Sequence, residues 1–506
     1  MREEGVVPPT ESVDVLIVGA GLSGIGAAVH LQRRCPSKSF AILEARGVIG
    51  GTWDLFRFPG VRSDSDMYPL GYSFRPWAET KAIADGYTIR RYISDTAREA
   101  GIDGHIRFGH KVTRASWSSD TALWTIEALC GAAAPVRLCC RFLYVCGGYF
   151  SYESAYRPSF PLEERYGGTI VHPQFWPEHF DYTGKRVVVV GSGATAVTLI
   201  PEMAKRAAHV TMLQRSPSYV FSLPTVDSIA QWLRRWLPAR VAYPLVRMKN
   251  VLIGMAFFQL ARRRPELAKK RLLRMVQNRL PPDFDVQRHF TPRYNPWDQR
   301  VCVVTDGDLF KAIGSGAVSV VTDEIDAFTA GGIRLKSGAE LPADIVVAAT
   351  GLKLNLLGGI GFMVDGVQMD MSRAMAYKGA MLSGMPNMAF TFGYTNASWT
   401  LKADLTANYV CRLIRHMESH GYAIATPRRD PALGEEPFLD FTSGYVVRAL
   451  KILPKQGADR PWKVYQNYFL DALTLRFGRI DDGVLAFGRP TRRKIPTHGG
   501  EAATRA

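Results

Sequence analysis

A glycine-rich turn that occurs twice, each time between a β-branched run and a helical run, constrains the fold of this 506-residue chain more than any other feature. The first copy follows residues 14–18 and places Gly19, Gly21 and Gly24 in a Gly-x-Gly-x-x-Gly pattern. Between a strand and a helix, this pattern brings the free N–H groups of the helix N-terminus to a pyrophosphate. The next predicted strand ends at Glu44, whose carboxylate can accept hydrogen bonds from the ribose hydroxyls of an adenosine. The first copy is therefore predicted to bind a dinucleotide.

The second copy follows a run of four valines and places Gly191, Gly193 and Ala196 at the same spacing. The pattern tolerates alanine at the third position. No acidic residue ends its second strand, which leads instead into Arg215 and Ser216. A carboxylate would repel a 2′-phosphate, whereas an arginine beside a hydroxyl can bind one. The second site is therefore predicted to prefer NADPH to NADH.

Two further predicted strands end in glycine, at residues 142–148 and 345–351, and they bracket the second turn. We interpret them as the two places where the backbone crosses between domains. The predicted fold is α/β, with two Rossmann-like dinucleotide-binding domains arranged as in glutathione reductase and an inserted helical segment. The expected limits are 1–148 for the first part of the FAD-binding domain, 149–352 for the NADPH-binding domain with a helical insertion at about 224–297, 353–488 for the return to the FAD-binding domain, and 489–506 for a flexible tail.

Two nucleotide sites on one chain imply that hydride passes from a nicotinamide to a bound flavin, which can hold two electrons. We therefore expect FAD at the first turn and NADPH at the second. A disulfide reductase would need a cysteine pair soon after the ribose carboxylate, but residues 45–64 contain no cysteine. The seven cysteines lack Cys-x-x-Cys spacing, so neither a metal site nor a disulfide framework is indicated. Oxygen is the expected electron acceptor.

Two longer segments carry a resemblance to a known family. Residues 50–64 resemble the Gly-x-Trp to Pro-Gly to Asp fingerprint of Baeyer–Villiger monooxygenases, and residues 166–177 are similar to the second fingerprint of that family. The second fingerprint begins with Tyr166 where the family has Phe. The resemblance is greatest to the mycobacterial ethionamide-activating subgroup, through residues 62–67, 294–300 and 393–402. The fingerprint residues expected to link the domains are Gly168, His172, Trp176 and Pro177.

The resemblance implies the roles of several residues. Arg300 matches the active-site arginine of the family, and Asp64 matches the carboxylate that orients it. A fixed guanidinium can stabilise the C4a-peroxide anion that attacks a ketone carbonyl. The residues expected to contact FAD, beyond the first turn and Glu44, are Gly51, Trp53, Asp64 and Val112.

One departure from the family affects the choice of nicotinamide cofactor. The lysine that many members place before the active-site arginine is Gln299 here, so Arg215 and Ser216 have to bind more of the 2′-phosphate. Selectivity for NADPH over NADH is then expected to be looser.

The resemblance implies oxidation of a ketone to an ester or lactone by O2, and also oxygenation of sulfides or thioamides. The alternatives within enzymes are an S- or N-oxygenating flavin monooxygenase and an NADPH oxidase. The alternative from another class is a non-catalytic, nucleotide-binding redox sensor at a membrane surface. The sequence leaves the physiological substrate, the regioselectivity and the oligomeric state open.

The chain carries a formal net charge of +17, concentrated in part at residues 262–274. This segment is interpreted as a solvated helix face, with a membrane-surface role as the alternative. No nucleic-acid-binding motif accompanies the charge, so nucleic acid is not an expected partner. No transmembrane helix is expected, because the apolar run 251–261 has about half of the roughly 20 residues that a span needs. The expected location is the cytoplasm, with the inner face of the membrane as the alternative.

Overall fold

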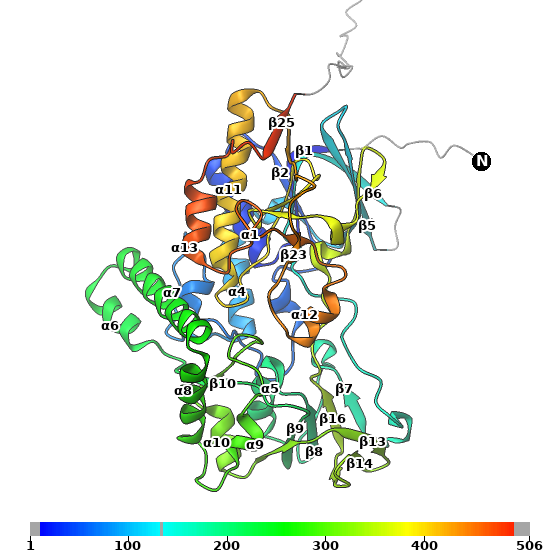
Figure 1. Ribbon diagram of the computed structural model, residues 1–506, viewed down its shortest axis with the longest axis vertical. Coiled ribbons are helices and arrows are strands. Elements are labelled where there is room, and N and C mark those ends of the chain that lie inside the picture. Colours follow the sequence, from blue (N-terminus) through cyan, green and yellow to red (C-terminus); the bar gives the residue numbers. More distant parts are fainter. Residues whose placement is uncertain (1–10, 132–134, 490–506) are drawn as a thin grey trace, which may run out of the picture.

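The computed structural model describes residues 11–131 and 135–489. These residues form two large sheets, one in each half of the molecule (Figure 1), and four smaller sheets of two or three strands. The predicted tail lies outside the described residues except for Arg489. The first sheet has eleven strands, with a main order of β18-β17-β4-β5-β6-β1-β2-β3. Its strands are β1 (Ser12–Val18), β2 (Phe40–Leu43), β3 (Ile106–Arg107), β4 (His110–Ser118), β5 (Leu123–Cys130), β6 (Val136–Val145), β17 (Gly361–Val364), β18 (Val367–Gln368), β19 (Ala376–Tyr377), β20 (Met381–Leu382) and β21 (Met388–Phe390).

The parallel part of this sheet positions the first turn. β1 pairs in parallel with β2 and with β6, so that Val18 lies level with both Leu43 and Val145. The carboxyl ends of the three strands therefore meet at one edge, where parallel sheets bind ligands. The helices that pack against one another over the core of this half are α1 (Leu22–Arg34), α4 (Gly86–Glu99) and α11 (Trp399–His420).

The second sheet has five parallel strands in the order β12-β9-β8-β16-β7. Val190 of β8 lies level with Leu213 and Ala348, so the second turn also stands at a carboxyl edge. The strands are β7 (Thr169–Val171), β8 (Arg186–Val190), β9 (His209–Gln214), β12 (Val318–Thr322) and β16 (Ile345–Ala348), and the helices packed beside them include α5 (Ala194–Met203) and α10 (Asp308–Gly314).

Two segments connect the halves, after β6 and after β16, and they run beside each other. The N–H of Ser151 donates to the carbonyl of Lys353 (2.8 Å), and the N–H of Asn355 donates to the carbonyl of Tyr149 (2.9 Å). These segments directly follow residues 142–148 and 345–351, which we interpret from the sequence as the two crossings. The exact domain limits stay a prediction.

Helices fill most of the region between β9 and β12. They are α6 (Ser228–Trp236), α7 (Ala239–Arg263), α8 (Pro265–Gln277) and α9 (Val286–Phe290). The sequence interval also contributes the parallel pair β10 (Val220–Leu223) and β11 (Cys302–Thr305). α6 and α7 extend to the side of the molecule, away from both sheets (Figure 1).

α7 is longer than the apolar run from which the sequence expectation was drawn. It has 25 residues, and its length and mean hydropathy alone would allow it to cross a membrane. Of its most apolar window, 22% is buried inside the protein. The expectation counted residues 251–261 only, because Arg247 and Lys249 interrupt the apolar sequence. The contacts of α7, and not its length, therefore decide which of its sides packs against the protein.

Candidate active site

The first glycine turn is enclosed by backbone. A Cβ atom at Gly24 would lie 1.8 Å from the carbonyl oxygen of Gly19, so only glycine fits without a shift of the chain. Gly21 caps α1, and no side chain accepts a hydrogen bond from the first turn of this helix. The N–H groups of that turn are thus not used by a side-chain cap, and a pyrophosphate would satisfy them. The turn therefore fits the dinucleotide expected there.

Glu44 lies where the sequence places it, directly after β2. One carboxylate oxygen accepts from the N–H of Ala20 (2.7 Å) and the other from the N–H of Arg46 (2.9 Å). The side chain is buried, and desolvation raises its pKa in spite of these two hydrogen bonds. Glu44 thus fastens the first turn to the second strand. Its contact with a ribose stays a prediction.

The first family segment folds against the first turn. Gly51 adopts a φ of +56°, and a Cβ atom there would lie 3.1 Å from the Cα of Gly21. Trp53 is partly buried and packs against the core of the first half. Val112 is buried in β4 on the other side of the sheet. The structure therefore brings Gly51 to the turn, whereas Val112 belongs to a separate part of the core.

Asp54, in the same segment, was not singled out from the sequence. Its side chain is buried and forms ion pairs with Arg46, with Arg57 (3.3 Å) and with Arg90 (2.9 Å). Burial opposes its ionisation, but the hydrogen bonds from Arg46 and Arg90 lower its pKa overall. The cluster ties the segment after the first turn to α4. Its arginines are dispersed along the sequence, so no local pattern indicates it.

The second glycine turn is more open. Gly191 has a φ of +141°, and a Cβ atom there would lie 2.3 Å from the carbonyl oxygen of Ala349. Gly193 caps α5 without a side-chain partner, and a Cβ atom there would have nothing within 4 Å. Ala196 is fully buried against the core. This turn also fits a pyrophosphate, and the space beside Gly193 is open.

Arg215 and Ser216 follow β9 and are both exposed. The carbonyl of Ser216 accepts from the hydroxyl of Ser192, in the second turn, at 3.0 Å. The end of β9 therefore lies beside the turn, at the position from which a side chain reaches an adenosine ribose. That these two residues bind a 2′-phosphate stays a prediction.

Arg300 and Asp64 meet, as the resemblance implies. Arg300 Nη2 lies 2.6 Å from Asp64 Oδ2, and about a third of each side chain is exposed, 35% and 33%. The Asp64 carboxylate raises the pKa of Arg300 above its already high ordinary value. The pair is therefore a fixed cation with one open side.

A chain of contacts joins this pair to the first turn. The ring of Tyr149 stacks on Trp399 with centroids 5.0 Å apart and an interplanar angle of 11°. Trp399 Nε1 donates to the hydroxyl of Ser23, which lies within the first turn, at 2.7 Å. Burial raises the pKa of Tyr149, and the nearby Arg300 partly opposes that rise. Arg300 thus lies beside Tyr149, which is connected through Trp399 to the first turn.

A second chain of contacts joins Arg300 to the other turn. Cys302, two residues further on, opens β11, and its Sγ donates to the carbonyl of Ser192 at 3.8 Å. Burial raises the pKa of this thiol to about 12, so it stays protonated and packs as a small apolar group. The Arg300–Asp64 pair therefore lies between the two dinucleotide turns.

Two tyrosines near Arg300 were missed by the sequence reasoning as site residues. Burial raises the pKa of Tyr149 and of Tyr445, and Arg300 lowers both in part, which places both hydroxyls near the guanidinium. Tyr149 directly follows the first predicted crossing, so its position was a usable signal. Tyr445 lies in α12 (Gly444–Ala449), about 145 residues beyond Arg300, and no local pattern marks it.

The loop before Arg300 is fixed from two sides. The N–H of Thr442 and its hydroxyl both donate to the carbonyl of Asp298, each at 2.9 Å. The Asp298 carboxylate accepts from Arg262 of α7 at 3.0 Å. Trp297 adopts a φ of +72° and packs edge-on against Phe258 of α7. The helical segment is therefore in direct contact with the active-site loop.

The second family fingerprint lies beside the crossings. His172 Nδ1 accepts from the N–H of Gln174 (3.1 Å), and the buried side chain of Gln174 donates to the carbonyl of Ser151 (2.8 Å) in the first crossing. Burial lowers the pKa of His172, which favours the neutral imidazole.

The other fingerprint residues pack around the ends of this segment. A Cβ atom at Gly168 would lie 2.5 Å from the carbonyl oxygen of Asp344, which precedes β16. Trp176 packs edge-on against Phe180, whereas Pro177 is exposed. These contacts suit a link between domains better than a group that reacts with substrate.

Two models of known protein families match the chain. The family described as flavin-binding monooxygenase-like matches residues 80–381. A NAD(P)-binding Rossmann-like domain matches residues 17–75, which contain the first turn.

Full-length relatives agree with this assignment. The chain is 54% identical over 482 residues to the FAD-containing monooxygenase EthA of Mycobacterium tuberculosis strain H37Rv, covering 95% of this chain and 98% of EthA. It is 47% identical over 482 residues to the probable FAD-binding monooxygenase AlmA of Acinetobacter baylyi, covering 95% and 97%.

Solved structures share the fold. An oxidised steroid monooxygenase bound to NADP has a TM-score of 0.75 at 21% identity, covering 94% of this chain and all of that one. OTEMO in complex with FAD and NADP has a TM-score of 0.68 at 23% identity, covering 82% and 88%. The predicted α/β fold and the predicted pair of cofactors are confirmed, and the chain belongs to the flavin-binding monooxygenase-like family as a flavoprotein monooxygenase.

Proposed function

We propose that this monooxygenase carries out Baeyer–Villiger oxidation, in which NADPH and O2 convert a ketone to an ester or lactone and water. The observation that carries the proposal is the Arg300–Asp64 ion pair, which lies between the two dinucleotide turns with about a third of each side chain exposed. A cation between two dinucleotide turns is available to a reaction that uses both cofactors, and this supports the proposal.

Bound FAD, reduced by NADPH, supplies the activation of O2. The part of Arg300 is electrostatic. Its guanidinium stays charged at all working pH values because Asp64 raises its pKa further. A delocalised cation on a fixed carboxylate stabilises negative charge that develops on oxygen during attack at a carbonyl. Nucleophilic oxygenation of a ketone needs this charge, whereas mere transfer of hydride between cofactors does not.

Asp64 and the neighbouring tyrosines position Arg300. The carboxylate accepts at 2.6 Å and fixes the direction of the guanidinium, while Tyr149 and Tyr445 lie near it. The stack of Tyr149 on Trp399 connects this arrangement to Ser23 in the first turn. Preorganisation of this kind avoids the free-energy cost of reorienting charges during the reaction.

The choice of NADPH over NADH rests on Arg215 and Ser216. Both are exposed at the end of β9, beside the second turn, and no carboxylate ends that strand. Gln299, next to Arg300, is neutral, so the 2′-phosphate gains no cation there. We therefore expect a preference for NADPH that is looser than in family members with a lysine at this position.

A sulfur substrate is the second candidate for the same site. The segments 62–67, 294–300 and 393–402, which resemble the ethionamide-activating subgroup, supply Asp64, Arg300 and Trp399 to the contacts around the guanidinium. Sulfides and thioamides are therefore included in the proposed substrate range.

The deciding experiment is product analysis. The FAD-loaded enzyme is incubated with NADPH, isotopically labelled O2 and a panel of aliphatic, cyclic and aryl ketones, sulfides and thioamides, and products are identified by mass spectrometry. The proposal expects esters or lactones that carry one labelled oxygen atom, with the other atom released as water.

Other results would assign the alternatives. Sulfoxides or thioamide S-oxides without any ester would make the enzyme an S-oxygenating monooxygenase, and N-oxides from a tertiary amine added to the panel would make it an N-oxygenating one. Consumption of NADPH with hydrogen peroxide as the sole oxygen product would make it an NADPH oxidase. No bleaching of the flavin by NADPH would make it a nucleotide-binding sensor.

A further inference from the structure

α7 carries an apolar face that the protein does not cover. Val241, Leu245, Met248 and Leu252 are exposed by 41–49% and follow one another at spacings of four, three and four residues. At 100° per residue these side chains lie along one side of the helix. The opposite side, with Tyr243, is buried. α7 therefore has one apolar side against the protein and another toward solvent.

α6, which packs against α7, carries a second exposed apolar side with two tryptophans. Trp232 is 60% exposed and Trp236 is 73% exposed, and Ile229, three residues before Trp232, is 50% exposed. Spacings of three and four place all of them on one side of α6, and α6 packs against α7. We name the combined surface the apolar face, and its members are Ile229, Trp232, Trp236, Val241, Leu245, Met248, Leu252 and Ile253. Exposed apolar surface gathered in this way marks an interaction site.

The charged residues of α6 and α7 themselves are of one sign, although Arg262 forms ion pairs with Asp298 and Asp440. From Ser228 to Pro265 the sequence contains eight lysines and arginines and no aspartate or glutamate. Six of the eight are exposed: Arg234, Arg235, Arg240, Arg262, Arg263 and Arg264. A surface of exposed tryptophans and aliphatic residues bordered by cations matches an anionic lipid surface, where indole rings favour the headgroup region. A second copy of the same face would oppose cations with cations.

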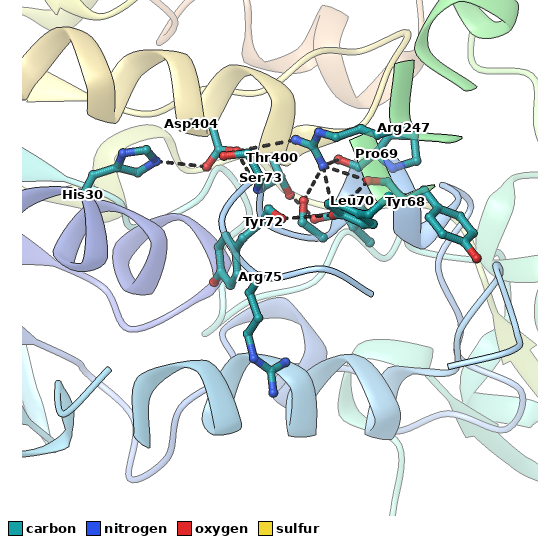
Figure 2. A network of polar contacts seen from close by, with 12 residues as sticks. His30, Tyr68, Pro69, Leu70, Tyr72, Ser73, Arg75, Arg247, Thr400 and Asp404 are labelled. Carbon is teal, nitrogen blue, oxygen red and sulfur yellow. Dashed lines mark hydrogen bonds and ion pairs between the residues drawn. The ribbon is translucent and has the colours of Figure 1, made fainter. Parts of the chain in front are cut away.

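Arg247 determines how α7 lies. It points inward, as Figure 2 shows, and its Nη1 donates to the carbonyls of Tyr68 (2.7 Å), Pro69 (3.0 Å) and Gly71 (2.6 Å). Its Nη2 lies 3.4 Å from Asp404 of α11.

Two further residues hold α7 against the body of the protein. The Tyr243 hydroxyl donates to the carbonyl of Tyr68 (3.1 Å), and Lys249 forms an ion pair with Asp227 (2.6 Å). A helix fastened along one side in this way cannot be surrounded by lipid. It can lie in the plane of a membrane surface.

We propose that α6 and α7 dock the enzyme on an anionic lipid surface, with Trp232 and Trp236 at the interface and the outer side of α7 against the acyl chains. The exposed arginines that form no ion pair in the described residues, such as Arg235 and Arg240, contribute attraction to the headgroups. The buried apolar side chains contribute the remainder. α7 continues from this face to Phe258, which packs on Trp297 in the active-site loop.

The test measures sedimentation of the FAD-loaded, full-length enzyme with vesicles. Vesicles of phosphatidylcholine with phosphatidylglycerol are compared with phosphatidylcholine alone, at low and at high salt. We expect binding to the anionic vesicles that weakens with salt. The double variant Trp232→Ser, Trp236→Ser should bind at least about tenfold more weakly, because it removes both indole rings from the interface. Its NADPH oxidation should equal that of the wild type, since neither residue touches the site.

A matched control and a conservative variant separate docking by the apolar face from nonspecific adsorption to lipid. Val367→Ser with Leu129→Ser removes two exposed apolar side chains, 64% and 40%, from the first sheet and should leave binding unchanged. Trp232→Phe with Trp236→Phe should still bind, while quenching of tryptophan fluorescence by brominated lipid falls.

Three outcomes would overturn the proposal. They are no binding of the wild type to anionic vesicles, equal binding of the serine double variant, and self-association without vesicles that the serine substitutions abolish. The last result would assign the apolar face to a second copy of the chain. None of these outcomes bears on Baeyer–Villiger activity, which is read from products.

Discussion

The two dinucleotide turns begin alike and differ at their later positions. In both, a Cβ atom on the first glycine would meet a neighbouring backbone carbonyl, at 2.8 Å from Cys146 for Gly19 and at 2.3 Å from Ala349 for Gly191. At the second position, Gly21 faces the backbone of Gly51, whereas Gly193 has open space around it. The tight strand-to-helix turn is thus common to both sites, and the surroundings are not.

The difference teaches how one local motif serves two roles. The first turn is covered by the segment after Glu44, and its Ser23 is bound by Trp399. The second turn has an unobstructed approach at Gly193 and an exposed Arg215 beside it. A covered site suits a cofactor that stays bound, and an open site suits one that enters and leaves at each turnover. The surroundings therefore argue for resident FAD at the first turn and exchanging NADPH at the second.

The largest effect is expected from a substitution that tests the third position of each turn. Gly24→Ala places a methyl group 1.8 Å from the carbonyl oxygen of Gly19, so the turn has to open. We expect this variant to lose its FAD, measured as the ratio of flavin absorbance to protein after desalting. Ala196→Gly makes the second turn match the first, and because it removes only a buried methyl group it should retain full flavin content. Equal flavin loss in both variants would contradict the prediction that FAD binds at the first turn only.

The next effect concerns the pair that lies between the turns. Arg300→Ala removes the fixed cation, and loss of one such electrostatic contact costs about 10²–10³ in rate. Ester formation should fall by about that factor, while reduction of the flavin by NADPH, followed as bleaching in a stopped-flow instrument without O2, should persist. Arg271→Ala, on the exposed side of α8, is the matched control and should change neither rate. An unchanged ester yield in Arg300→Ala would remove Arg300 from the proposed reaction.

A smaller effect, on the KM for NADPH, is expected from substitutions at the second turn. Arg215→Ala is expected to raise the KM for NADPH about tenfold and to leave the KM for NADH unchanged, because only NADPH carries the 2′-phosphate. Gln299→Lys should do the reverse and lower the KM for NADPH. Steady-state oxidation of each cofactor measures both effects. A similar rise in KM for NADPH and NADH in Arg215→Ala would contradict the proposed phosphate contact.

The units of the fold that are local in sequence were predictable. The run of four valines before the second turn lies in β8, and the β-branched run that ends at Val18 lies in β1. Each has a continuous β-branched run, followed by glycines whose conformations other residues rarely adopt, so the signal lies within about 20 residues. Family fingerprints added Asp64 and Arg300, which the structure places in contact.

The parts that depend on distant contacts were not predictable. Tyr149 and Tyr445 approach Arg300 from segments about 150 residues away on either side. The apolar face of α7 was hidden as well, because its exposed side chains alternate in sequence with buried ones and with Arg247. The sequence reasoning looked for basic charge at 262–274, whereas the exposed apolar surface lies before that segment. Which side of a helix is covered is decided by packing partners, and local sequence does not specify them.

The smallest expected effect is on the stability of the protein. It concerns Asp66, which lies where α7 contacts α3 (Met67–Leu70) in the half that contains the first turn. This residue caps α3, where its carboxylate accepts from the N–H of Tyr68 at 2.7 Å. Burial raises its pKa to about 7, and the nearby Asp227 adds to the rise. The unfolded chain has the ordinary value near 3.9, so the folded protein binds this proton more tightly. The stability that the protonated group provides is complete below about pH 4 and is lost as the pH rises to about 7.

Asp66→Asn tests this effect, because asparagine also caps helices but does not ionise. At pH 8 the variant should be more stable than the wild type by about 1 kcal/mol, a value reduced because the carboxyl is only partly buried and solvent screens it. This corresponds to a rise of about 1–2 °C in Tm by differential scanning fluorimetry, and the gain should shrink at pH 5. Asp85→Asn, at the exposed N-cap of α4, is the matched control for replacing an N-cap aspartate by asparagine. If the gain for Asp66→Asn were the same at both pH values, the carboxyl would not titrate in this range, and its protonation would not contribute to the contact between α3 and α7.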